Sequence, residues 1–262
     1  MKSALTGTVA MVLAVALAGC VSQTPVTSQP QSQADSPNKS DSVRRAQIHA
    51  ELSGAYFQRG QMGVALEEAR LSLKESGDYV PAISMLALIY MELRDDAQAI
   101  TNFEQALRLS PNDSEVLNNY GWFLCQRGGP GRAMDYFQAA LKNPLYSTPE
   151  RAFLNAGVCA RMMGNEVVAE SNLRQALIIQ PLLGPALYQM ADISYKRAQL
   201  KDAESFLTRY NRATASPTAD ALLLGVRVSR ALGDKSSEGS YLQQLKRRFP
   251  EAPQTSQAVE GR

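Results

Sequence analysis

A pair of amphipathic segments at residues 82–111 sets the pattern for most of this chain. Apolar side chains recur there at intervals of three and four residues in two runs, which the polar stretch 93–96 separates. This spacing predicts two helices, each with one apolar face. Small Ala87 and Ala99 stand where the two helices must approach each other, and Pro111 cannot continue the second helix. The segment therefore predicts a helical hairpin.

The hairpin pattern recurs along the chain at a period near 34 residues. A single hairpin leaves one apolar face uncovered, so the copies are expected to cover one another. In the first helices a small residue recurs at Ser53, Ala87, Gly121, Gly157 and Ala191. In the second helices the small residues are Ala65, Ala99, Ala133, Ala169 and Ala203. With the closing prolines, these positions resemble the tetratricopeptide repeat, which implies an all-α, right-handed superhelical solenoid of about six helical hairpins.

The repeats divide most of the chain, and we expect a single tetratricopeptide domain at residues 43–250. The expected hairpins are 46–79, 80–113, 114–149, 150–183, 184–216 and 217–250. The last of them departs most from the pattern, as terminal repeats usually do because one of their faces meets water. Residues 251–262 are expected to form a flexible tail.

The first residues have the features of a targeting signal. One basic residue, Lys2, precedes a short apolar stretch that ends in Leu-Ala-Gly-Cys at residues 17–20. Small residues before a cysteine resemble a bacterial lipobox, so 1–19 is expected to be a signal peptide and Cys20 the lipidated first residue of the mature chain. The alternative is an ordinary signal peptide with a chance cysteine. Val21 rather than Asp follows the cysteine. In this respect the chain resembles Gram-negative lipoproteins that are exported to the outer membrane.

After Cys20, the segment 20–42 is rich in Ser, Gln, Pro, Thr and Asn and has almost no large apolar residue. Such a composition buries too little surface to offset chain entropy. We therefore expect a disordered tether between the lipid and the repeats.

Little in the sequence points to catalysis. The chain has 27 basic and 25 acidic side chains, and this near-neutral balance argues against a nucleic-acid partner. Packing explains the single histidine, His49, and no phosphate loop, metal-ligand spacing or hydrolase motif occurs. We expect no enzymatic activity, cofactor, metal or small-molecule substrate.

Cys125 and Cys159 lie at nearly equivalent points of the first helices of the third and fourth repeats. Adjacent repeats place such helices side by side, so an exported chain can form a disulfide there. Two buried free thiols are the alternative. A thiol oxidoreductase is a third reading, although the pair lacks C-x-x-C spacing.

A row of mostly apolar residues is expected to line an inner groove. In tetratricopeptide stacks the first helix of each hairpin lines the concave face, with Arg161 and Lys196 among its inward positions here. The register selects Phe57, Leu88, Met91, Asn118, Trp122, Leu154, Val158, Met162, Tyr188 and Tyr195. A groove rich in aromatic residues and Met suggests a peptide or an amphipathic helix as ligand. Alternatively, some of these side chains pack against neighbouring helices.

Residues 118–125, 133–146 and 155–159 resemble the type IV pilus biogenesis and stability lipoproteins. In that family a lipobox precedes the repeats, and the third and fourth repeats carry paired cysteines, here Cys125 and Cys159. The resemblance implies a pilotin on the periplasmic side of the outer membrane. Such a protein binds the pilus secretin subunit and promotes its localisation and multimerisation, which supports pilus biogenesis and twitching motility. A general envelope scaffold that binds a cell-wall synthase or another assembly factor is the alternative. The chain alone is expected to be monomeric.

Overall fold

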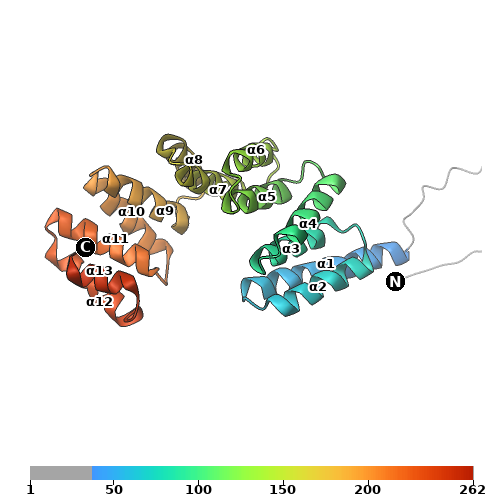
Figure 1. Ribbon diagram of the computed structural model, residues 1–262, viewed down its shortest axis with the longest axis horizontal. Helices are drawn as coiled ribbons and strands as arrows, with labels where there is room; N and C mark the ends of the chain where they lie inside the picture. The colour runs from blue at the N-terminus through green and yellow to red at the C-terminus, as the bar shows by residue number, and fades with distance from the viewer. Residues whose placement is uncertain (1–36, 262) are drawn as a thin grey trace, which may run out of the picture.

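The computed structural model describes residues 37–261, and within them the chain forms helices and no strand (Figure 1). In chain order the helices are α1 (Pro37–Gln58), α2 (Met62–Glu75), α3 (Val80–Glu92), α4 (Asp96–Leu109), α5 (Ser114–Gln126), α6 (Pro130–Leu141), α7 (Pro149–Met162), α8 (Glu166–Ile179), α9 (Gly184–Lys196), α10 (Leu200–Ala213), α11 (Ala219–Leu232), α12 (Lys235–Arg248) and α13 (Pro253–Glu260). The prediction of an all-α stack of six hairpins is confirmed, with α1–α2 as the first hairpin and α11–α12 as the last.

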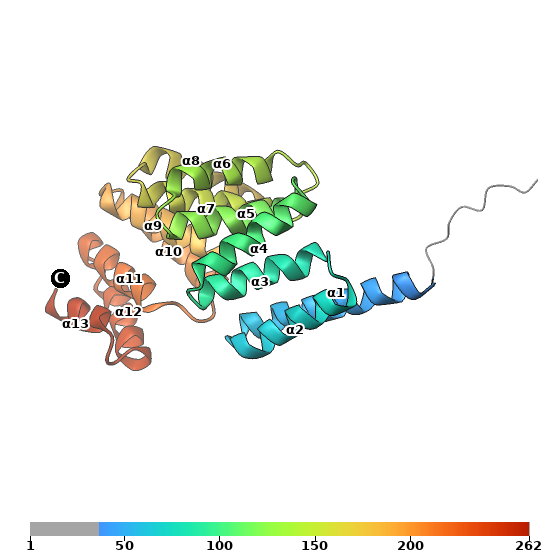
Figure 2. The same ribbon diagram turned by 45° about the vertical axis from the view of Figure 1, so that its right-hand side comes forward.

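The hairpins stack in chain order into a curved solenoid. Within the described residues, helices of different hairpins touch only where the hairpins are neighbours, and α13 touches α11 and α12. Figure 1 shows the stack as an arch, with α5, α7 and α9 on its inner side and α6, α8 and α10 on its outer side. In Figure 2, α5 and α7 lie side by side beneath α6 and α8. The first helices of successive hairpins therefore form one continuous inner surface.

Close helix contact explains the recurring small residue. A Cβ added to Gly157 in α7 would lie 2.7 Å from Cγ of Leu173 in α8. At the equivalent Gly121 in α5, it would lie 2.9 Å from a ring carbon of Phe137 in α6. Carbon atoms normally pack at about 3.5–4.0 Å, so these glycines let the paired helices approach each other.

The turn inside each hairpin places one residue in the left-handed region of the backbone. Gly60, Gly128 and Gly164 occupy this position at positive φ. Arg94 and Ala198 hold the equivalent places with φ of 64° and 56°. A side chain disfavours this conformation, so these two hairpins carry local strain at their turns.

Both ends of the repeat domain differ from the expected bounds. Helix α1 begins at Pro37, so residues 37–42 belong to a helix and not to the tether. The rest of the tether, the expected signal peptide at 1–19 and Cys20 lie outside the described residues.

The prediction of a flexible tail is wrong for Pro253–Glu260, which forms α13. Ala258 of this helix is buried in a cluster with Leu222 and Leu245. Nη2 of Arg230 also donates a hydrogen bond of 2.9 Å to the Ala258 carbonyl. Helix α13 packs against α11 and α12 and shields part of the apolar surface of α11 from water.

Candidate partner-binding surface

Most of the predicted groove residues keep part of their surface exposed. Met162 is 59% exposed. The half-buried members are Phe57, Leu88, Trp122, Leu154, Val158, Tyr188 and Tyr195. Their inward-facing atoms extend the core, and Leu88 and Trp122 pack against the same buried cluster. The inner surface is therefore apolar but shallow, and each side chain offers a partner only part of its area.

Two predicted groove residues, Met91 and Asn118, are buried, so the prediction that they line the groove is wrong. Met91 is 3% exposed and packs in the core with Phe123, because it lies at the end of α3 where the next hairpin covers it. Asn118 is 1% exposed, and its Oδ1 accepts a 3.0 Å hydrogen bond from Nδ2 of Asn155 in the next hairpin. Both side chains hold neighbouring repeats together.

A disulfide joins Cys125 in α5 to Cys159 in α7, with their Cα atoms 5.8 Å apart. The two residues are 2% and 0% exposed. Sδ of Met162 lies 3.7 Å from Sγ of Cys125 and helps to cover it. A redox catalyst needs a sulfur that a substrate can reach, so this burial favours a structural role over a thiol oxidoreductase.

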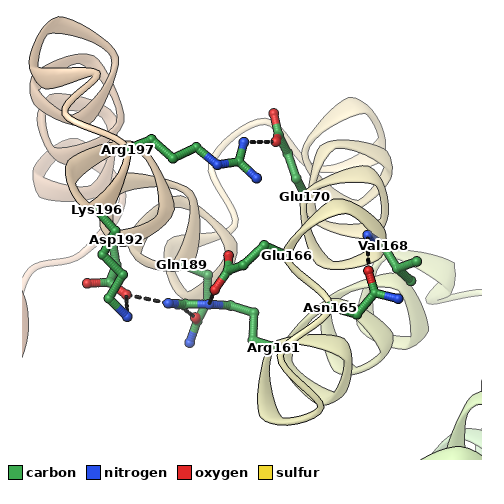
Figure 3. A network of polar contacts seen from close by, with 9 residues as sticks. All are labelled: Arg161, Asn165, Glu166, Val168, Glu170, Gln189, Asp192, Lys196 and Arg197. Atoms are coloured by element: carbon green, nitrogen blue, oxygen red, sulfur yellow. Dashed lines mark hydrogen bonds and ion pairs between the residues drawn. The ribbon is translucent and has the colours of Figure 1, made fainter.

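Arg161 is the centre of a polar network that joins the fourth hairpin to the fifth (Figure 3). Its guanidinium donates hydrogen bonds to Gln189 and Asp192 of α9. Nε of Arg161 also lies 3.7 Å from Oε1 of Glu166, and Nζ of Lys196 lies 2.9 Å from Oδ2 of Asp192. Arg161 and Lys196 were expected to face the groove, but both form ion pairs with the Asp192 carboxylate, and Arg161 also lies near Glu166.

The charges of this network shift the pKa of the Asp192 carboxylate. Burial alone raises the pKa of Asp192, but hydrogen bonds from Arg161 and Lys196 outweigh burial and hold that pKa below its ordinary value. Figure 3 also shows Arg197 paired with Glu170 of α8. The Arg161–Asp192 and Arg197–Glu170 ion pairs both link the hairpin α7–α8 to the hairpin α9–α10, so they fix the relative position of these two hairpins.

A cavity of about 400 Å³ opens between the first helices of the first three hairpins. Its lining comes from α1, α3, α5 and the loops before α3 and α5: Gln47, Ala50, Glu51, Tyr79, Pro81, Ser84, Met85, Leu88, Asp113, Glu115, Val116 and Asn119. Of the groove residues predicted from the sequence, only Leu88 belongs to it.

The cavity residues that the groove prediction missed do carry a signal in the sequence. Glu51, Met85 and Asn119 follow one another at intervals of 34, as do Gln47, Pro81 and Glu115. The groove prediction selected mostly other repeat positions on the same helices. The repeat period therefore places three copies of each position around one depression.

Other sites for chemistry are few among residues 37–261. His49 pairs through Nδ1 with Oε2 of Glu68 at 2.7 Å, between α1 and α2. No group of three metal-ligating side chains that could hold an ion occurs in the described part of the chain. None of the described helices combines the length and apolar character needed to cross a bilayer.

Known proteins resemble this chain over most of its length. Two tetratricopeptide-repeat family models match residues 80–113 and 102–135. The type IV pilus assembly protein PilF of Pseudomonas aeruginosa is 28% identical over 238 residues, which cover 91% of each chain.

Two solved structures match the same architecture. The crystal structure of PilW, described as a widely conserved type IV pilus biogenesis factor, aligns with a TM-score of 0.71 at 33% identity, over 82% of this chain and 98% of that one. The structure of Pseudomonas aeruginosa PilF aligns with a TM-score of 0.75 at 24% identity, over 86% of this chain and 99% of that one. The solenoid described above is thus nearly the whole of both structures.

Proposed function

Because the chain belongs to the tetratricopeptide-repeat family of type IV pilus biogenesis factors, we propose that it is an outer-membrane pilotin. In this role it binds the secretin subunit of the pilus machinery and promotes its delivery to the outer membrane and its multimerisation there. The observation that carries the proposal is the 33% identity to PilW, which extends over 98% of that chain. An alignment of this extent includes the repeats and their order.

The inner surface is the proposed binding site for secretin. It displays partly exposed aromatic and aliphatic side chains, including Trp122, Val158 and Tyr195, on consecutive first helices. Such a row fits an extended segment or an amphipathic helix of a partner, because apolar anchors in a shallow groove bind alternate side chains. The fixed spacing of the hairpins keeps these anchors in place before the partner arrives.

Cys20 carries the membrane part of the proposal. A lipidated N-terminus with several acyl chains holds a protein stably at a bilayer. A bound secretin subunit would then reach the outer membrane together with the anchor. The raised local concentration of subunits at that surface would favour ring assembly.

The test measures secretin multimers in cells that lack this protein. Membranes are separated by density, and the multimers are resolved on semi-native gels. We expect multimers in the outer-membrane fraction to disappear, and the wild-type gene to restore them. The Cys20→Ala variant should still bind secretin but leave the multimers mislocalised.

A second set of variants tests the inner surface itself. Val158→Glu places a charge on α7 within the row, whereas Val167→Glu places the same charge on α8, where the side chain is 76% exposed. We expect the first to abolish secretin binding and the second to leave it intact.

Normal multimers in the deletion strain would refute the pilotin proposal and favour an envelope scaffold with another partner.

A further inference from the structure

The cavity between α1, α3 and α5 has an apolar part of its lining and a size that suits a side chain of a partner. Ala50, Pro81, Met85, Leu88 and Val116 supply apolar surface. The volume of about 400 Å³ falls within the range of about 300–1,000 Å³ typical of ligand pockets. Met85 is flexible and polarisable, so it can adapt to an inserted group.

Three carboxylates, those of Glu51, Asp113 and Glu115, also line the cavity, and no lysine or arginine does. Asp113 and Glu115 have a local role, because Asp113 accepts a hydrogen bond from the Val116 amide and Glu115 lies in the first turn of α5. Glu115 also accepts a hydrogen bond from the Thr148 hydroxyl. These two acidic residues would therefore be useful to the fold even without a ligand.

Glu51 has a weaker role in the fold, limited to a contact within α1. It lies far from either end of α1, and its Oε1 accepts a 2.8 Å hydrogen bond from the uncharged amide of Gln47. The negative charge is felt across the cavity, because burial and the Glu51 carboxylate together raise the pKa of Tyr79. A cavity lined by several negative charges lowers its electrostatic energy when a cation enters.

We infer that this cavity holds an arginine or lysine side chain of a partner protein, with a neighbouring aliphatic residue packed on Met85 and Leu88. The inference rests on the proposed function in that it treats the inner surface as a protein-binding surface. Gln47 and Asn119 also line the cavity and supply amide groups that can hydrogen-bond to the main chain of the inserted segment. The cavity thus selects a basic segment, whereas the remaining row of apolar side chains has no charge preference.

The first experiment screens the full chain against a display library of random dodecapeptides. We expect the selected peptides to be enriched in Arg or Lys next to an aliphatic residue. The affinity of one selected peptide and of its Arg→Gln counterpart is then measured by fluorescence anisotropy. Enrichment of acidic peptides, or of apolar peptides without a basic residue, overturns the inference.

Matched variants locate the effect in the cavity. Glu51→Gln should weaken binding of the basic peptide about fivefold, which is the upper end of what an exposed ion pair contributes, and should leave the Arg→Gln peptide unaffected. Glu92→Gln removes the same charge from exposed surface of α3 outside the cavity and should change neither affinity. The fivefold difference should shrink at high salt because mobile ions screen the pair. Equal affinities of wild type and Glu51→Gln for the basic peptide would contradict a role for the cavity.

Secretin binding separates this inference from the proposed function. If wild type and Glu51→Gln bind the secretin subunit equally while the peptides show no charge preference, the pilotin proposal stands and the inference is wrong. If the chain binds basic peptides as expected but not secretin, the cavity is correctly described and the partner is another protein.

Discussion

Replacing Gly157 with alanine should destabilise the solenoid, although alanine is the better helix former. In an open helical position, Gly→Ala gains about 1 kcal/mol of helix propensity. In α7, however, the new Cβ would lie 2.7 Å from Cγ of Leu173 and 3.2 Å from the carbonyl oxygen of Ala169. Restoring normal contact distances requires α7 and α8 to separate or Leu173 to change rotamer, and overpacking of this kind costs about 1–3 kcal/mol. The net expectation is a loss of about 0–2 kcal/mol.

Gly54 in α1 provides the matched control. A Cβ there has no atom within 4 Å, so Gly54→Ala should stabilise the chain by up to about 1 kcal/mol. The two variants should therefore differ by about 1–3 kcal/mol in the free energy of unfolding. Urea denaturation followed by far-ultraviolet circular dichroism measures this difference.

A double-mutant cycle tests whether Leu173 causes the effect. In a Leu173→Ala background the methyl group of Gly157→Ala has room, so the second change should become neutral or stabilising. The reasoning would be refuted if Gly157→Ala stabilised the wild-type chain as much as Gly54→Ala does and showed no coupling to Leu173.

Three further expectations follow from contacts elsewhere in the solenoid. Reducing the Cys125–Cys159 bond opens a loop with a sequence separation of 34, which should lower the free energy of unfolding by about 3–4 kcal/mol; thermal unfolding with and without reductant, compared with Cys125→Ala, measures it. Asp192→Asn should cost about 1–3 kcal/mol at neutral pH, because it leaves the largely buried Arg161 less well paired. The folded-state pKa of Asp192 lies below its ordinary value. The loss of stability in Asp192→Asn should therefore be full above about pH 4 and vanish as the pH falls through the folded-state pKa. Denaturation at several pH values measures this profile. Ala198→Gly should stabilise the chain by about 1–2 kcal/mol because the turn holds this residue at φ 56°; no gain in the urea midpoint would contradict the strain.

The hairpins were predictable from the sequence because their signal repeats. Small residues such as Gly121 and Gly157 mark close helix contacts, and the closing prolines mark helix ends. Because these signals recur from hairpin to hairpin, preferences that are weak in one copy become clear over several. The side-by-side position of Cys125 and Cys159 followed from the same register.

Exposure on the inner surface could not be predicted to the same degree. Helical periodicity identifies the face on which a residue lies, but the burial of Met91 and Asn118 depends on how closely the next hairpin packs over that face. The cavity around Glu51 and Met85 likewise depends on the spacing of three first helices. Helix α13 was missed because a segment of 8 residues is too short to show a clear period and is stabilised by docking on α11.

The disulfide has a mechanical consequence, because the hairpins touch only their neighbours. A force applied between the two ends of such a stack passes through each interface in series, and the weakest interface opens first. The interface between the third and fourth hairpins is covalently closed by Cys125 and Cys159, so it cannot be the one that yields. The bond also prevents the segment between these cysteines, with a sequence separation of 34, from being pulled out. The fully stretched molecule is therefore shorter by roughly 110–120 Å than it would be without the disulfide. Under load the third and fourth hairpins therefore stay together, and the stack opens at one of the other interfaces.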